Sequence, residues 1–231
     1  MGYQLLTEPR AQPKLGKSLD IGWANWALHL APHDLSGRNV CPKSTPGCRK
    51  YCIYWQGRGA MSMAQQARIR RTDWLFEDTQ SFKLQLIHEI TAALRWGDRH
   101  KVQTAIRLNG TSDIVWEKKW EALFDLFHQV TFYDYTKIPK RKTPDNYHLT
   151  FSRSEKNKID CAREFSNGKN VAVVFRTNEA KPSECTITPF VQSPVYDGDK
   201  NDCRFLDPPG HVIALRAKGS AKHDTTGFVV D

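Results

Sequence analysis

The chain of 231 residues has few cysteines and no long apolar run. No stretch approaches the ~18 consecutive apolar residues that a transmembrane helix requires, and charged residues are spread throughout. The segment from Met1 to Leu15 lacks the apolar core of a signal peptide and carries Glu8, Arg10 and Lys14. We therefore expect a protein without a membrane span that stays in the cytoplasm, where thiols remain reduced.

Acidic residues are fewer than basic ones, and the formal net charge is +9. This excess favours anionic partners, with nucleic acid among them. The chain has no paired zinc-finger spacing, no ribonucleoprotein signature and no basic leucine zipper. Its length predicts a single domain, residues 1–231, that folds without the help of a metal or a disulfide.

Three of the six cysteines are concentrated in one loop, which reads Cys41-Pro-Lys-Ser-Thr-Pro-Gly-Cys48-Arg-Lys-Tyr-Cys52. Its prolines and glycine favour turns, and turns let neighbouring thiols converge on a metal. Structural zinc sites usually add a second cysteine pair, which this chain lacks. The C-x6-C-x3-C spacing of residues 41–52 therefore predicts a four-iron cluster with one iron that has no local protein ligand.

Two other interpretations of the loop remain open. A zinc site would need a fourth ligand, for which His33 is a candidate from the His29 and His33 pair. A cluster with four protein ligands would draw on a cysteine outside the loop, with Cys203 as the first candidate and Cys185 and Cys161 behind it.

Strand-like and helix-like segments alternate along the chain, which indicates an α/β fold with a parallel sheet, either open or curled. A first strand, 21–30, runs into the cysteine loop. Apolar residues at helical spacing predict a helix over 81–96 and another whose buried stripe is Trp116, Trp120, Leu123 and Phe127. A third helix is expected over 155–165. Strands are expected at 102–108, 130–135, 147–151, 171–175 and 211–215, and long loops at 177–210 with a short strand at 186–191.

Polar residues follow these strands. Because functional groups gather at the carboxyl ends of parallel strands, we expect them to share one rim with the cysteine loop. Ser112, Asp113 and Ser154 are equally well explained as caps of the helices that follow them. The rim residues are Asn109, Gly110, Thr111, Ser112 and Asp113 after one strand, Asp134 and Lys137 at the next, Ser152 and Glu155 after a third, Arg176 after a fourth and Lys218 after the last.

A cysteine triplet after the first strand, followed by strand-helix units with polar strand ends, resembles the radical S-adenosylmethionine superfamily, a partial (β/α) barrel that holds a [4Fe-4S] cluster. A narrower similarity, to the bacteriophage "gene product 88" family, covers most of the chain. It rests on Cys41-Pro to Tyr51-Cys52, Arg107-Leu-Asn-Gly-Thr-Ser-Asp113, Phe132-Tyr-Asp-Tyr-Thr-Lys137, Tyr147-His-Leu-Thr-Phe-Ser152, Asn170-Val-Ala-Val-Val-Phe175, Asp197-Gly-Asp199 and Ala217-Lys-Gly219.

The resemblance implies a role for each part of the site. The loop cysteines would hold three irons, with Tyr51 packed nearby, and the fourth iron would bind the methionine portion of S-adenosylmethionine. The segment from Asn109 to Asp113 stands where the superfamily often has a Gly-Gly-Glu segment, and Ser152 or Glu155 would meet the ribose. Asp134, Lys137 and Arg176 would orient a substrate. Two departures are the longer cysteine spacing and the missing glutamate.

Two classes of function follow from these observations. The first is a phage-encoded radical S-adenosylmethionine-like enzyme that acts on an unidentified small molecule with the help of a reductant. The second is a non-catalytic cluster protein for electron transfer, redox sensing or nucleic-acid binding. A zinc-stabilised binding protein is a further alternative. The host cytoplasm is the expected location for each of them.

Overall fold

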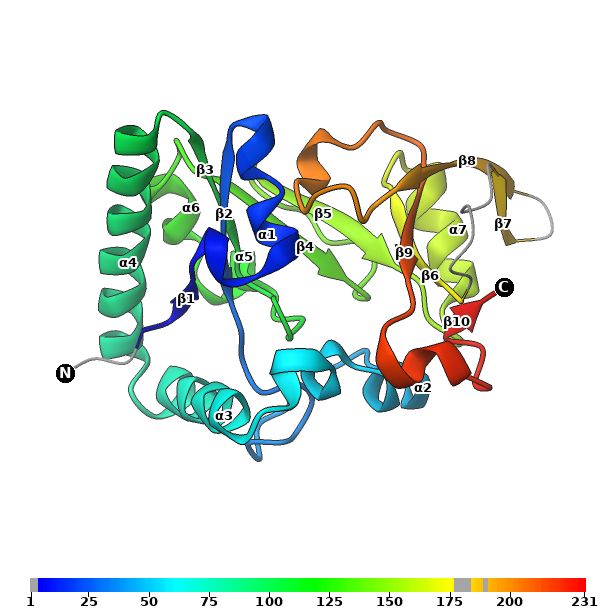
Figure 1. Ribbon diagram of the computed structural model, residues 1–231, viewed down its shortest axis with the longest axis horizontal. Helices are drawn as coiled ribbons and strands as arrows, with labels where there is room; N and C mark the ends of the chain where they lie inside the picture. Colours follow the sequence, from blue (N-terminus) through cyan, green and yellow to red (C-terminus); the bar gives the residue numbers. More distant parts are fainter. Residues whose placement is uncertain (1–3, 177–183, 189–190) are drawn as a thin grey trace.

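The computed structural model of the chain describes residues 4–176, 184–188 and 191–231. The structure is mixed α/β (Figure 1), as the sequence predicts. The α-helices are α1 (Pro13–Gly16), α2 (Pro46–Lys50), α3 (Ser62–Glu77), α4 (Thr79–His100), α5 (Trp116–Lys119), α6 (Ala122–Leu126) and α7 (Lys158–Ser166). The strands are β1 (Leu6–Thr7), β2 (Trp23–Leu28), β3 (Gln103–Arg107), β4 (Thr131–Thr136), β5 (Tyr147–Ser152), β6 (Val171–Phe175), β7 (Glu184–Thr188), β8 (Val191–Asp197), β9 (Val212–Arg216) and β10 (Val229–Val230).

The strands form a mostly parallel sheet in the order β1-β2-β3-β4-β5-β6-β9-β8-β7, with β10 beside β6. All neighbours from β2 to β9 along this path are parallel, whereas β1 and β7 join the sheet as antiparallel edges. The strands from β2 to β6 lie side by side in the order of the sequence. Because crossovers between parallel strands are right-handed, this order places the connecting helices on one face and differs from the doubly wound arrangement.

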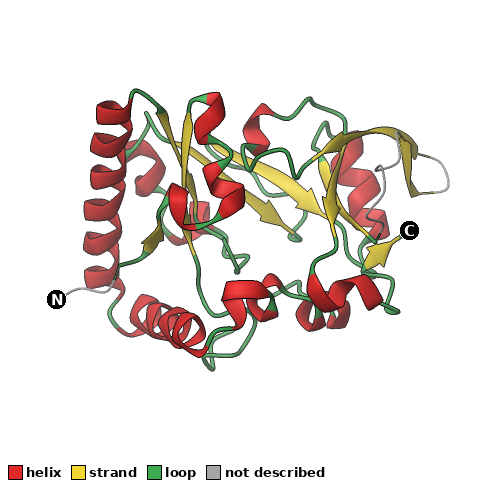
Figure 2. Cartoon of the chain, viewed as in Figure 1, coloured by secondary structure: helices red, strands yellow, loops and turns green. Residues whose placement is uncertain are grey.

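The two faces of the sheet have different chemistry, because successive side chains of a strand point to opposite sides. The outer face packs against the helices, as the cartoon in Figure 2 shows for the long helix beside the sheet. There Trp26, Leu28, Ile106 and Phe132 join the apolar stripe of α4 in the main hydrophobic core. The hydrophobic stabilisation of the fold therefore comes largely from this face, which leaves the other face free to carry polar groups.

The inner face of the sheet is lined by the alternate residues of the same strands. Its lower part is filled by the N-terminal segment and by the 3-10 helix η5 (Arg204–Leu206). Asn25 on β2 lies 3.0 Å from Ser18 and 3.5 Å from Cys203, while the ring of Tyr133 on β4 packs edge-on against Phe205. The upper part, at the carboxyl ends of the strands, is left open as a cavity.

Most predicted elements are found, with shifted ends. The predicted helix at 81–96 lies within α4. The strands predicted at 21–30, 102–108, 130–135, 147–151, 171–175 and 211–215 correspond to β2, β3, β4, β5, β6 and β9 to within a few residues. The single helix expected around Trp116 to Phe127 is wrong. Trp120 leaves the helical backbone conformation, with φ −159° and ψ 75°, so the chain forms α5 and α6, although the stripe residues Trp116 and Leu123 are fully buried.

The other differences concern loops. The helix expected over 155–165 begins only at Lys158, because the Asn157 side chain bonds the backbone of Ser154 and Ser152 in a preceding turn. The short strand expected at 186–191 corresponds to the β7–β8 hairpin, of which residues 189–190 lie outside the described part, as do residues 177–183 of the predicted loop region. None of the described helices combines the length and the apolar composition needed to cross a membrane.

Candidate functional site

The cysteine loop is held by a helix cap. Thr45 precedes Pro46, the first residue of α2, and its hydroxyl accepts a hydrogen bond from the Cys48 backbone at 3.4 Å. A threonine cap followed by proline is a strong start signal even for a short helix. The same hydroxyl donates to Glu155 Oε2 at 2.7 Å, and the Gly47 N–H donates to Glu155 Oε1 at 2.8 Å. Glu155 thus anchors the loop to the segment that follows β5.

All three cysteines of the loop line one cavity of about 380 Å³ at the carboxyl ends of the strands. Each is partly buried and free of disulfide bonds. Cys41 Sγ lies 3.8 Å from the Thr111 carbonyl oxygen, which joins the loop to the turn after β3. Burial, together with the nearby Cys52, Asp113 and Cys48, raises the pKa of the Cys41 thiol to about 12, against the effect of a hydrogen bond with the His33 backbone. The thiols are therefore close enough to influence one another's charge.

Lys137 brings a positive charge to the thiols. Burial alone would lower the pKa of Lys137, but Cys48 and Asp113 stabilise its ammonium group and the net effect is a raised pKa. Its Nζ also lies 3.1 Å from the hydroxyl of Ser152 at the end of β5. The end of β4 thus carries a cation that contacts both the cysteine loop and the neighbouring strand, an arrangement that stabilises thiolates.

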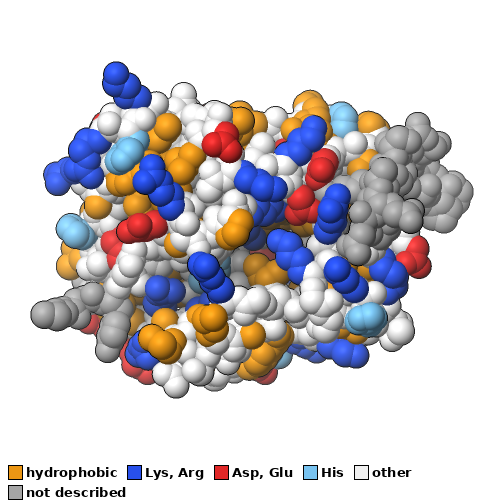
Figure 3. Space-filling view, viewed as in Figure 1, with side chains coloured by type: hydrophobic (Ala, Val, Ile, Leu, Met, Phe, Trp, Pro, Cys, Tyr) orange, Lys and Arg blue, Asp and Glu red, His pale blue; other side chains and the backbone are white. Residues whose placement is uncertain are grey.

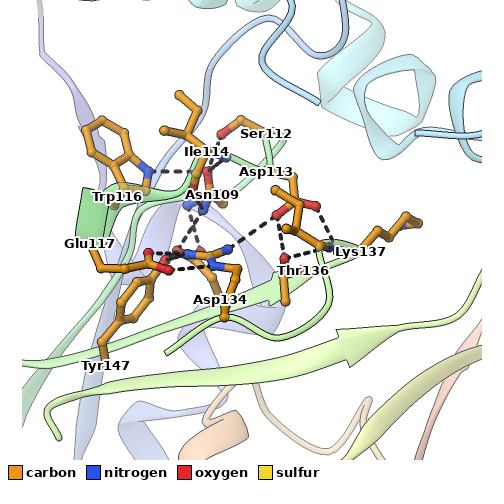
Figure 4. Close-up of polar contacts among 12 residues, drawn as sticks. Asn109, Ser112, Asp113, Ile114, Trp116, Glu117, Asp134, Thr136, Lys137 and Tyr147 are labelled. Carbon is orange, nitrogen blue, oxygen red and sulfur yellow. Dashed lines mark hydrogen bonds and ion pairs between the residues drawn. The ribbon is translucent and has the colours of Figure 1, made fainter. Parts of the chain in front are cut away.

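The turn after β3 uses most of its polar atoms for its own structure. Figure 4 shows Asn109 at the centre of this network. Asn109 Oδ1 accepts hydrogen bonds from Ser112, Ile114 and Trp116, and its backbone and side-chain amides donate to the Asp134 carboxylate at 2.7 and 3.1 Å. The turn residues line the cavity, but the Asn109 side chain itself is committed to holding the turn.

Two other turn residues are similarly engaged. The Thr111 hydroxyl donates to the Leu30 carbonyl oxygen at 2.5 Å. The Asp113 carboxylate accepts hydrogen bonds from the Thr136 hydroxyl and the Lys137 backbone, each at 2.8 Å. Burial raises the pKa of Asp113, and these two hydrogen bonds counteract that effect. The hydrogen bonds of Thr111 and Asp113 therefore give both side chains a structural role in closing the turn. Both residues also line the cavity.

Among the predicted rim residues, three do not line the cavity. Asp134 lies on the outer face, fully buried, where Tyr147 donates to it at 2.7 Å; burial raises its pKa to about 7, against the effect of Tyr147 and Arg107. Arg176 binds Asp231 at 2.5 Å and the carbonyl oxygens of two residues near the C-terminus. Glu155 is the third, and its carboxylate is occupied by the cysteine loop.

The strand parity that separates these residues could have been read from the sequence. On β4, Asp134 points to the outer face and the next residue, Tyr135, points to the inner face, where it lines the cavity. The same alternation on β3 directs Arg107 to the cavity two residues before Asn109. Arg107 and Tyr135 were not predicted as site residues, and Lys14 and Asp202 approach them from segments whose position only the tertiary structure determines.

Asp202 forms the polar floor of the cavity. Its carboxylate lies 3.2 Å from Lys14 Nζ and 3.4 Å from Arg107, and it accepts a hydrogen bond from Tyr133 at 2.9 Å. Burial alone would raise the pKa of Asp202, but Lys14, Arg107 and Arg204 hold it well below its usual range. A buried carboxylate that stays ionised in this way requires at least one paired cation.

A family model described as gene product 88 matches residues 3–231. The chain belongs to the gene product 88 family. No curated protein and no solved structure matches it. The segments on which the resemblance rested, from the cysteine loop to Ala217-Lys-Gly219, include much of the cavity lining in this gene product 88 chain.

Cys203 and Cys161, two of the cysteines outside the loop, lie apart from this site. Cys203 is buried beside Asn25, and Cys161 is buried on α7 with its thiol 3.4 Å from Asn157. Neither lines the cavity. The Cys185 side chain lies outside the described part of the structure. Among the described side chains, three thiols therefore face the cavity and no fourth cysteine joins them.

The side chains around the cavity that could bind a metal are thiols, imidazoles and carboxylates. No group of three or more described His, Cys, Asp and Glu side chains is arranged to hold one metal ion. The described thiols form neither a preformed zinc site, which needs thiolates at about 2.3 Å from one centre, nor a preformed cluster site. His33, the candidate fourth zinc ligand, also lines the cavity; it pairs with Asp34 and lies 3.1 Å from an Arg49 guanidinium nitrogen. What the structure does show is that the three thiols line one cavity.

Proposed function

We propose that Cys41, Cys48 and Cys52 hold a [4Fe-4S] cluster and that the protein is a radical S-adenosylmethionine-like enzyme. The observation that carries the proposal is the placement of all three thiols on one cavity at the carboxyl ends of consecutive parallel strands. This is where α/β proteins bind their ligands. The consecutive strand order and the helices on one face also support a curled sheet, or partial barrel, which the superfamily uses.

The number of cysteines at the cavity favours the enzyme over a non-catalytic cluster protein. Among the described side chains, three thiols would leave one iron without a cysteine ligand, and Cys203, the first candidate for a fourth, is packed against Asn25 instead. A reduced cluster with an open iron supplies an electron to a bound sulfonium cofactor. The phage host cytoplasm would provide the reducing conditions that keep the thiols available.

The chain's own residues have three tasks in this proposal. Glu155 positions the loop through its hydrogen bonds to Thr45 and Gly47. Lys137 offsets the negative charge of the thiolates, since it already interacts with Cys48. The turn from Asn109 to Asp113 forms the wall where the cofactor would lie, and its shape is maintained by Asn109 and Asp134.

The test is anaerobic purification with iron and sulfide analysis, followed by electron paramagnetic resonance with and without S-adenosylmethionine. We expect about four irons per chain, as a [4Fe-4S] cluster requires, and a spectrum that changes when the cofactor is added. Zinc in place of iron would contradict the cluster. A cluster whose spectrum ignores the cofactor would contradict the enzyme and support the electron-transfer or sensing alternative.

Alanine variants give the matched comparison. Replacing Cys41, Cys48 or Cys52 singly is expected to abolish the cluster, whereas Cys161→Ala and Cys203→Ala are expected to retain it. The last two thiols are buried away from the cavity, so their loss tests protein packing alone. Loss of the cluster in Cys203→Ala would show four protein ligands and overturn the open-iron proposal.

A further inference from the structure

The cavity carries more positive than negative charge at its floor. Lys14 and Arg107 share the Asp202 carboxylate, at 3.2 and 3.4 Å. Burial lowers the pKa of Lys218, and the positive charges of Lys14 and Lys17 lower it further, whereas Asp199 and Asp202 act in the opposite direction. In this part of the cavity lining, Lys14, Arg107 and Lys218 thus stand against the carboxylates of Asp199 and Asp202. Figure 3 shows Lys and Arg side chains gathered around the middle of this face.

The neighbouring cation does not change this balance. Arg204 lies beside Asp202 but is itself 3.2 Å from Asp207, and both side chains are almost fully buried. That pair is neutral by itself. Among the described residues, Lys218 makes no ion pair with a carboxylate within 4.0 Å, which leaves its charge to be balanced by something else.

Arg107 has unused hydrogen-bonding capacity. Its guanidinium lies over the Tyr135 ring, 4.7 Å from the centroid, and donates to Asp202 only at the long distance of 3.4 Å. Arg107 Nε and the Tyr135 hydroxyl are buried and have no hydrogen-bond partner. Buried donors without partners are unfavourable and are usually explained by a missing ligand or water.

The proposed cluster would not supply the missing negative charge here. The lysine that interacts with the three thiols of the loop is Lys137, at the end of β4. Lys14, Arg107 and Lys218 instead surround Asp202, and Arg107 precedes the turn after β3 by two residues. Their counter-charge must come from another ligand.

We propose that the substrate of the cavity carries an anionic group, a phosphate or a carboxylate, which Arg107, Lys14 and Lys218 bind. The proposal rests on the function proposed above, because it names the substrate class of the same site. The apolar lining beside these cations, which includes Val174, Leu215 and Phe228, accommodates the uncharged part of such a molecule. Planar guanidinium groups bind both phosphate and carboxylate through paired hydrogen bonds.

Titration calorimetry of the whole protein with inorganic phosphate and with acetate, at constant ionic strength set by chloride, tests this site. We expect saturable binding of one anion per chain, and the tighter of the two anions identifies the chemical group. Lys218→Ala should weaken that binding roughly tenfold, since it removes one charge-assisted contact. Lys222→Ala, an exposed lysine in the same segment that does not line the cavity, is the matched control and should bind as the wild type does.

The outcomes separate this inference from the cluster proposal. Arg107→Lys should weaken binding while it keeps the charge beside Asp202, so a stably folded variant remains available. Equal affinity in the wild type and Lys218→Ala, or no saturable binding of either anion, would overturn the inference. The same titration of Cys41→Ala, which lacks the proposed cluster ligand, should still show anion binding. Anion binding without any cluster in the wild type would refute the cluster proposal alone.

Discussion

The Glu155 carboxylate accepts a hydrogen bond from the Gly47 backbone at 2.8 Å, although the two residues are 108 positions apart in the sequence. This contact joins the loop that carries the cysteines to the end of β5. It also explains why Glu155 does not face the cavity. The contact gives Glu155 a positioning role that can be measured separately from any role in binding.

Replacing Glu155 by Ala removes the acceptor for both Gly47 and Thr45. We expect the free energy of unfolding to fall by about 2 kcal/mol and the iron content of the reconstituted protein to fall with it. Glu155→Gln keeps one carbonyl oxygen as an acceptor for Gly47, so its free energy of unfolding and its iron content should lie between those of the wild type and Glu155→Ala. Thermal unfolding and iron analysis give the readouts, and unchanged iron content in Glu155→Ala would contradict the positioning role.

Gly47 is packed too closely to accept a side chain. A Cβ atom there would lie 2.4 Å from Thr226 Oγ1 and 2.8 Å from Phe228 Cβ. Gly47→Ala should therefore destabilise the protein by roughly 1–3 kcal/mol and displace the loop. Gly16→Ala is the control, since its Cβ would meet only the Pro9 carbonyl oxygen at 3.6 Å. Equal melting temperatures for the two variants would show that the loop is not packed in this way.

Asp134 should make stability depend on pH near neutrality. Its pKa is raised by burial to about 7 in the folded protein, from an ordinary value of 3.8, so the folded state binds the proton more tightly. The unfolding free energy should then decrease as the pH rises from about 4 to 7. Asp134→Asn removes this contribution. Denaturant unfolding at several pH values measures it, and parallel pH profiles for the variant and the wild type would refute the assignment.

Asp202 should have the opposite pH dependence. Its lowered pKa, caused by Lys14, Arg107 and Arg204, means that the folded state favours the ionised form. Its contribution is present above pH ~4 and is lost as the pH falls further. At pH 7, Asp202→Asn should cost about 3–5 kcal/mol, because it leaves buried cations without a partner. The difference in unfolding free energy between Asp202→Asn and the wild type should shrink as the pH falls below about 4. A difference that stays constant with pH would contradict this interpretation.

Tyr133→Phe isolates one part of the Asp202 site. The variant loses the hydrogen bond of 2.9 Å to the carboxylate but keeps the ring contact with Phe205. We expect a loss of about 1.5–3 kcal/mol in stability, the usual range for a hydrogen bond to a charged group. Tyr135→Phe is the matched control, because the Tyr135 hydroxyl has no partner to lose. A larger loss for Tyr135→Phe would contradict the hydrogen bonding described here.

The parts of the fold that depend on local pattern were predictable. The stripe of Phe82, Leu86 and Ile90 predicted α4, and the apolar runs of β2 and β6 predicted buried strands. The break between α5 and α6 was not predictable in this way, because Trp120 keeps the helical spacing in the sequence while its backbone is not helical. Tertiary packing of the stripe outweighs helix propensity over such short segments.

For the site, the sequence by itself determined the loop chemistry, because three cysteines lie in one loop with prolines and a glycine after a first strand. The short helix α2 and its Thr45 cap within this loop were not predicted. The sequence also contained the parity that places Tyr135 and Arg107 on the cavity side and Asp134 on the other, because side chains alternate along any strand. Only the tertiary structure decided that Glu155 holds the loop, that Cys203 is buried beside Asn25, and that Lys14 and Asp202 meet Arg107. These contacts join residues distant in sequence, and local propensity carries no information about such pairings.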